Sequence, residues 1–343
     1  MPQLPPHSPL RGRPLRVAAG VVVLLALAGY VAAQYLGGKP ADTRCVVRGG
    51  DGTQDSGARY ELTAEQAANA AVISSVGTRR GMPERAVTIA LATALQESAL
   101  RNIRHGDRDS LGLFQQRPSQ GWGTGDQILD PAYSAARFYQ HLTEVPGYSR
   151  LPLTVAAQRV QRSGFPQAYA KHEPDAALLA SALTGRTPAS LSCDAANGAA
   201  EAGPGDPAKV RRELAKAFGE GVAPRIATAG SPVKDRAGDG AGGTNDKAGG
   251  GRAGAKVVVV PVTGAQVGVM ADGGRGDGAG GRGEQRGWEL AHWAMAHSAD
   301  LRITRISYAG REWSAQRAKQ GWQRTSAPTA PATTTEVHIS TTN

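Results

Sequence analysis

A single carboxylate, Glu97, stands at the end of an apolar stretch of the chain. The run Ala86–Leu95 (AVTIALATAL) is apolar around nearly its whole circumference, which predicts a buried helix whose exposed end carries Glu97. Apolar surroundings raise the pKa of a carboxyl group because they disfavour its charged form. Glu97 is therefore a candidate general acid for breaking a glycosidic bond, and the alternative is an ordinary solvated charge at a helix end.

Two further carboxylates, Asp107 and Asp109, lie on the loop that follows this helix. Either could hold a water molecule or stabilise an oxocarbenium-like transition state, and its distance from Glu97 would decide between inverting and retaining chemistry. The alternative is a charged loop in which Arg108 forms an internal salt bridge.

Planar amides and aromatic rings in the following turn region could bind a sugar chain in a cleft. The candidates are Gln115, Gln116, Trp122 and Tyr133. The alternative for the two aromatic residues is packing in the core or in a lid.

Helix signals place these residues in one mainly α-helical domain over 61–193. Thr63 and Gln66 form a capping box before a helix over Ala67–Val76, which Gly77 is expected to end. Pro83 opens the helix that leads to Glu97, and Asp130-Pro131 opens the next one. The last two helices are expected over 155–162 and 174–183.

Composition and pattern divide the rest of the chain. Gly, Ala, Asp and Arg dominate after residue 194, and such a sequence cannot bury enough apolar surface to fold throughout. The expected layout begins with a cytoplasmic N-terminus (1–16), a transmembrane signal-anchor (17–36), a juxtamembrane spacer (37–60) and the helical domain (61–193). A largely disordered Gly-rich region (194–283) follows, with a short helix near 208–219 and a strand near 256–262. The last part is a small α+β module (284–340) with a helix over 287–299 and strands over 303–308 and 336–339.

The apolar run 17–36 is long enough to cross a bilayer, and Arg11, Arg13 and Arg16 precede it. The positive-inside rule then predicts a single-pass protein of the cell membrane, with a cytoplasmic N-terminus and the bulk of the chain outside the cytoplasm. The alternative is a cleaved signal peptide ending at Val31-Ala32-Ala33.

The chain has only two cysteines, Cys45 and Cys193, at the two ends of the best-patterned region. This placement suits a disulfide in an oxidising compartment, and two unpaired thiols are the alternative. Neither cysteine belongs to a CxxC motif or a Cys/His cluster, so structural zinc is not expected. No other metal or cofactor is expected. The formal charge of +10 is spread over tails and Gly-rich stretches with few aromatic residues, which does not favour nucleic acid as a partner.

Glu97-Ser98 and Ser110-Leu111-Gly112-Leu113-Phe114-Gln115 resemble the Glu-Ser and Ser-x-Gly-Leu-x-Gln signatures of the lysozyme-like superfamily. The likeness is strongest to soluble lytic transglycosylases and goose-type lysozymes, and the span 60–193 resembles uncharacterised exported actinobacterial membrane proteins that carry such a domain. The resemblance implies peptidoglycan as substrate, cut between N-acetylmuramic acid and N-acetylglucosamine. It implies that Glu97 acts first as acid and then as base, and that Ser110 belongs to the substrate-binding turn.

One departure concerns the Ala-Tyr-Asn-x-Gly motif that supplies a tyrosine near the acid in transglycosylases. The corresponding stretch here is 156–160 (AAQRV), and Tyr169 could take the place of that tyrosine. The C-terminal module bears a fainter likeness to zinc D-Ala-D-Ala carboxypeptidases, with His338 as a remnant of their late ligand. Because the stretch 256–286 contains no histidine, no working zinc site is expected, and His292 and His297 are interpreted as helix-face residues.

Together these observations predict a membrane-anchored peptidoglycan-cleaving glycosidase that uses Glu97. The alternative is a catalytically inactive protein that binds peptidoglycan strands through the same cleft. A third hypothesis is a division or secretion scaffold acting through the basic Gly-rich stretch 220–255.

Overall fold

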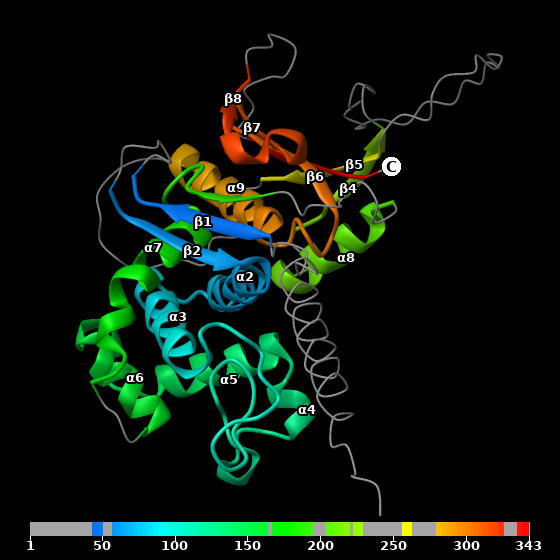
Figure 1. Ribbon diagram of the computed structural model, residues 1–343. Helices are drawn as coiled ribbons and strands as arrows, with labels where there is room; N and C mark the ends of the chain where they lie inside the picture. Colours follow the sequence, from blue (N-terminus) through cyan, green and yellow to red (C-terminus); the bar gives the residue numbers. More distant parts are fainter. Residues whose placement is uncertain are drawn as a thin grey trace, which may run out of the picture. The chain divides into compact units, whose positions relative to one another are not determined.

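Residues 43–50, 57–163, 167–194, 204–219, 222–228, 256–262, 279–325 and 335–342 are described by the computed structural model (Figure 1). The α-helices are α2 (Ala64–Arg79), α3 (Glu84–Ser98), α4 (Gly125–Ile128), α5 (Pro131–Thr143), α6 (Leu153–Gln161), α7 (Glu173–Leu183), α8 (Pro207–Phe218) and α9 (Ala279–Ala296). Short 3-10 helices are η1 (Pro118–Gln120), η2 (Tyr148–Arg150), η3 (Ala170–His172) and η5 (Ala315–Gln320). The strands are β1 (Arg44–Arg48), β2 (Arg59–Thr63), β3 (Leu191–Cys193), β4 (Arg225–Thr228), β5 (Lys256–Pro261), β6 (Ile303–Tyr308), β7 (Arg311–Ser314), β8 (Gln323–Arg324) and β9 (Glu336–Thr341).

The prediction of a mainly α fold is wrong. The described residues are about half helical, and 19% of them form strands in two antiparallel sheets. One sheet has the order β2-β1-β3 and the other the order β4-β5-β9-β6-β7-β8. The strands of the first sheet are only three to five residues long, and β1 pairs with β3 between residues 148 positions apart, so no local pattern in the sequence predicts them.

The prediction of a single-pass membrane protein is contradicted as well. Among the residues that the structure describes, no helix combines the length and the apolar character needed to cross a bilayer. The segment 17–36, on which the prediction rested, lies outside the described residues, as does most of the stretch 194–283.

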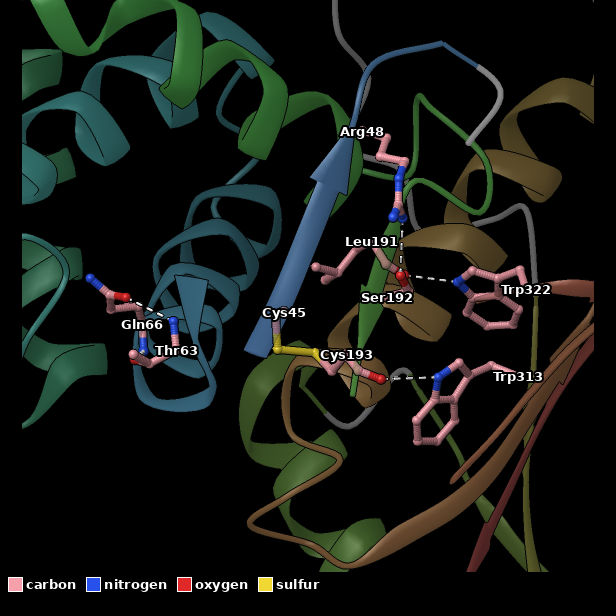
Figure 2. The surroundings of a disulfide bond; sticks show 9 residues. All are labelled: Cys45, Arg48, Thr63, Gln66, Leu191, Ser192, Cys193, Trp313 and Trp322. Carbon is pink, nitrogen blue, oxygen red and sulfur yellow. Dashed lines mark hydrogen bonds between the residues drawn. A yellow bond between two sulfur atoms is a disulfide. The ribbon is translucent and has the colours of Figure 1, made fainter. Parts of the chain in front are cut away.

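The first sheet closes the helical part of the chain through a disulfide. Cys45 of β1 and Cys193 of β3 face each other in register and are joined by a bond between residues 148 positions apart. Figure 2 shows the indole rings of Trp313 and Trp322 pointing at the backbone of β3. The indole N–H of Trp313 donates to the carbonyl of Cys193 at 3.2 Å, and that of Trp322 donates to the carbonyl of Leu191 at 2.8 Å. The C-terminal part of the chain is thus hydrogen-bonded to the strand that the disulfide holds.

Helix α9 extends this contact into one continuous core. It packs against α2, α7 and β3 on one side and against β6 and β9 of the six-stranded sheet on the other. Trp288 on α9 is buried, and its ring lies edge-on to those of Tyr308 and Trp322. Residues 43–343 accordingly form one compact unit by their internal contacts.

Close approaches of helices explain two glycines. Gly77 continues α2 instead of ending it, because the Tyr139 ring of α5 packs so closely there that a Cβ on Gly77 would lie 2.7 Å from the Tyr139 hydroxyl. Gly185 follows α7 with φ +75°, and a Cβ there would lie 1.9 Å from the backbone oxygen of Gln285 on α9. Both positions therefore require glycine for packing.

His292 makes the stability of this core depend on pH. Its side chain is fully buried on α9, its Nδ1 hydrogen-bonds the carbonyl of Ala182 at 2.7 Å, and burial lowers the pKa of His292 from 6.5 to about 4. As the pH falls, His292 therefore binds a proton near pH 6.5 in the unfolded chain but only near pH 4 in the folded chain. We expect the free energy of unfolding to be unaffected by this group above pH 7 and to fall by about 3 kcal/mol as the pH drops from 6.5 to 4.

Urea unfolding at pH 7 and at pH 4.5 checks this expectation in the unsubstituted chain and in His292→Gln, which cannot titrate. The variant should lose less stability between the two pH values. Equal losses in the two proteins would show that His292 does not cause the dependence.

Candidate active site

The end of helix α3 is held in a fixed conformation. After Ser98, Ala99 and Leu100 both adopt left-handed backbone angles, with φ of 51° and 60°. The side-chain amide of Gln66 donates to the carbonyl of Ala99, and that of Asn69 donates to the carbonyl of Leu100, each at 2.8 Å. Polar side chains of α2 thus satisfy carbonyl groups that the end of a helix leaves without intrahelical partners.

Ser98 joins this helix end to the turn that carries the Gly-Leu-Phe-Gln sequence. Its hydroxyl lies 3.1 Å from the carbonyl of Ala94 and 2.8 Å from the carbonyl of Leu113. Leu113 and Phe114 are fully buried, and the Phe114 ring stacks on Phe138 of α5. The two motifs, separate in the sequence, are therefore one structural unit.

Glu97 lies partly buried beside two hydrogen-bond donors. The hydroxyl of Tyr169, just before η3, donates to Oε1 of Glu97 at 2.7 Å. The side chain of Gln161, the last residue of α6, lies close enough to Glu97 to lower the pKa of its carboxyl group, and its amide nitrogen donates to the carbonyl of Phe114 at 2.8 Å. Three segments that are distant in sequence, α3, α6 and the start of η3, thus meet around one carboxyl group.

Opposing effects set the proton affinity of Glu97. Burial raises the pKa of this carboxyl group, and the hydrogen bonds from Tyr169 and Gln161 lower it by a smaller amount, so that the net shift is upward. Burial and the neighbouring Glu97 also raise the pKa of the Tyr169 hydroxyl, which therefore keeps its proton at neutral pH. A carboxyl group with a raised pKa next to donors that favour its ionised form can both give and take back a proton.

His172 contacts the residue that precedes Glu97 in the sequence. Nε2 of His172 is 3.1 Å from Oε1 of Gln96, the residue before Glu97. Burial lowers the pKa of His172, so its ring is neutral near pH 7. The pair ties the end of η3 to the end of α3.

The loop aspartates do not join Glu97. Asp109 accepts hydrogen bonds from Arg117 at 2.8 Å and from the backbone and hydroxyl of Ser119 at 2.8 and 3.0 Å, and these contacts hold the pKa of Asp109 well below its usual range. Asp107 is 93% exposed and lies 3.9 Å from Arg108. Asp109 therefore braces its loop through Arg117 and Ser119, and Asp107 faces solvent.

Three of the predicted sugar-binding residues, Ser110, Gln115 and Gln116, lie in the turn that carries the Gly-Leu-Phe-Gln sequence. Ser110 and Gln116 are buried, and the Gln116 amide donates to the carbonyl of Ser134 at 3.1 Å. Gln115 is partly buried, with a left-handed φ of 47°, and its amide lies 3.2 Å from the carbonyl of Gly112.

Trp122 and Tyr133 stabilise the neighbouring loop. The Tyr133 hydroxyl donates to the carbonyl of Trp122 at 3.2 Å, and the Trp122 ring lies edge-on to His141. Of the predicted binding residues, Tyr169 is the one with a hydrogen bond to Glu97.

Sequence reasoning missed Gln161 and His172. Gln161 lies at the end of a predicted helix, where a polar residue is ordinary, so nothing local distinguishes it.

No group of three or more His, Cys, Asp or Glu side chains that could hold a metal ion occurs within the described ranges. His338, in β9, lies 3.5 Å from Glu336.

Replacing Tyr169 by Phe should raise the pKa of Glu97 further, because it removes a donor that stabilises the ionised carboxylate. Titration of ¹³C-labelled glutamate carboxyl groups by NMR measures this directly. Tyr133→Phe is a matched control, since its hydroxyl bonds a backbone carbonyl of another loop. An unchanged or lowered pKa in Tyr169→Phe would contradict the assigned role.

Comparison with known proteins yields one family match. Residues 262–336, which include all of α9 through β8, match the family described as the VldE C-terminal domain. No curated protein matches the chain. Glu97, Gln161 and Tyr169 lie outside the matched residues, so the part of this chain that is similar to a known domain is the part that packs on β3 through Trp313 and Trp322.

Proposed function

We propose that this protein is a peptidoglycan-cleaving glycosidase, a lytic transglycosylase or muramidase, with Glu97 as its general acid and base. The observation that carries the proposal is the 2.7 Å hydrogen bond from the Tyr169 hydroxyl to Glu97, at the end of a buried helix where the pKa of the carboxyl group is raised. In this proposal, Tyr169 takes the place of the tyrosine that transglycosylases carry near their acid and that the stretch 156–160 lacks.

In the first step, the proton of Glu97 moves to the glycosidic oxygen while the bond from that oxygen to C1 of the muramoyl sugar breaks. The leaving sugar departs with a hydroxyl group, and positive charge develops at C1. Glu97 is left as a carboxylate, which the Tyr169 hydroxyl and the Gln161 amide stabilise.

In the second step, the carboxylate takes a proton from the oxygen that attacks C1. This oxygen is the C6 hydroxyl of the same sugar in a transglycosylase and water in a muramidase. The new C–O bond closes the reaction, and Glu97 regains its proton. A single carboxyl group that alternates between its two forms suits a site in which Asp109 is occupied by Arg117 and Ser119.

The test uses the full chain and purified, insoluble peptidoglycan, with two readouts. Sedimentation measures binding, and sugar in the supernatant measures cleavage. The proposal expects both binding and release of soluble fragments. Binding without any release would instead support the catalytically inactive peptidoglycan-binding protein. If the chain neither bound peptidoglycan nor released fragments from it, peptidoglycan would be excluded as its ligand.

A further inference from the structure

The loop 101–108 is fixed against the turn that follows it. The backbone N–H of Gly112 donates to the carbonyl of Ile103 at 2.8 Å. Gly106 lies so close to Gln115 that a Cβ on Gly106 would come within 1.9 Å of the amide oxygen of Gln115. The loop therefore has a defined position on the surface of this turn.

This position is next to the candidate acid. The same turn carries Phe114, whose carbonyl accepts the hydrogen bond from Gln161, the neighbour of Glu97. At the other end of the loop, the backbone N–H of Arg101 donates to the carbonyl of Ser98 at 3.1 Å. One end of the loop thus bonds to Ser98, the residue after Glu97. The turn on which the loop lies contacts Gln161, which lies beside Glu97.

The loop exposes an excess of positive charge. Arg101, Arg104, His105 and Arg108 are all exposed, and Asp107 is the one carboxylate within 101–108. The side chains of Arg101 and Arg104 form no hydrogen bond or ion pair with any other residue that the structure describes. Arg108 lies 3.9 Å from Asp107, beyond hydrogen-bonding distance, with both side chains largely in solvent.

A neighbouring arginine shows the contrast. The side chain of Arg117 is partly buried and pairs with Asp109 at 2.8 Å, which marks it as a structural residue. The guanidinium groups of Arg101 and Arg104 have no such internal partner in the described part of the chain, and that of Arg108 has only the exposed Asp107 at 3.9 Å. Their planar pairs of N–H donors match the two oxygens of a carboxylate.

We propose that the loop 101–108 binds the carboxylates of the peptide stems on the glycan strand that Glu97 cleaves, an inference that rests on the proposed function. The backbone of such a strand consists of N-acetylated sugars without charge, so the acidic groups that pass beside the cleavage site are those of the stems. The loop selects strands that carry peptides over bare glycan.

The test measures binding by the full chain carrying Glu97→Gln, so that strands stay intact. The ligands are glycan strands with their stems and strands from which an amidase has removed the stems, both freed of phosphate polymers by hydrofluoric acid. We expect tighter binding to strands with stems, and we expect Arg101→Gln/Arg104→Gln to reduce this preference by about fivefold, as the loss of two solvent-exposed ion pairs implies. The matched control is Lys209→Gln/Arg211→Gln, which removes the same charge from the exposed face of α8 and should keep the preference.

Equal preference in the two double variants would overturn the proposal. It would also be overturned if the unsubstituted loop showed no preference, or if a preference appeared only with peptidoglycan that retains its phosphate polymers, since phosphate would then be the ligand. Because the readout is binding, it is independent of whether Glu97 cleaves the strand.

Discussion

Glu97→Gln should lower the rate of fragment release from purified peptidoglycan by a factor on the order of 10² or more, because it removes the general acid. The substitution keeps the shape of the side chain and leaves an oxygen that can still accept the hydrogen bond from Tyr169. It removes only the proton that the glycosidic oxygen needs. The rate of release, measured at equal protein concentration, is the observable.

Glu65→Gln provides the matched control for this variant. Glu65 is exposed in the first turn of α2, so its substitution makes the same chemical change away from the site and should leave the rate unchanged. Far-ultraviolet circular dichroism should be the same for all three proteins. A Glu97→Gln protein as active as the unsubstituted chain would contradict the assignment of the acid.

Replacing both Cys45 and Cys193 by Ala should cost about 5 kcal/mol of unfolding free energy, since the bond closes a loop of 148 residues in the unfolded chain. The loss should extend to the C-terminal part of the chain, because Trp313 and Trp322 donate to the carbonyls of β3. Denaturant unfolding followed by tryptophan fluorescence reports both effects.

The control compares each protein with and without a thiol reductant. Reductant should destabilise the unsubstituted chain toward the stability of the double variant and should leave the variant unchanged. If the double variant unfolds at the same denaturant concentration as the oxidised chain, the disulfide does not stabilise this fold.

Local signals in the sequence predicted many of the helices. The capping box of Thr63 and Gln66 forms as expected, and Asp130 caps α5 with Pro131 in its first turn. The strand predicted over 303–308 is β6. In each case the information lies within a few neighbouring residues, so the pattern alone is sufficient.

Long-range pairing could not be predicted in the same way. Strand β1 lies in the segment for which a spacer was expected, and only its pairing with β2 and β3 makes it a strand. Gly77 does not end α2. This position is a glycine because the ring of Tyr139 on another helix packs against it. The mainly α prediction failed at such positions.

The site shows the same division. The apolar run before Glu97 was sufficient to place a carboxyl group at the end of a buried helix. The approach of Tyr169 and Gln161 depends on how α6 and η3 pack on α3, which no spacing in the sequence specifies. The hydrogen bonds that engage Asp109 were likewise visible only in the structure.

The masses of the soluble products test the central claim most directly. Purified peptidoglycan is incubated with the full chain or with its Glu97→Gln variant, and the supernatants are analysed by mass spectrometry. We predict disaccharide-peptide fragments ending in muramic acid, in either the anhydro or the hydrated form, which differ by one water, and we predict that the variant releases almost none. Equal amounts of these fragments from both proteins, or none from the unsubstituted chain, would contradict the role of Glu97 as the acid that cleaves the strand.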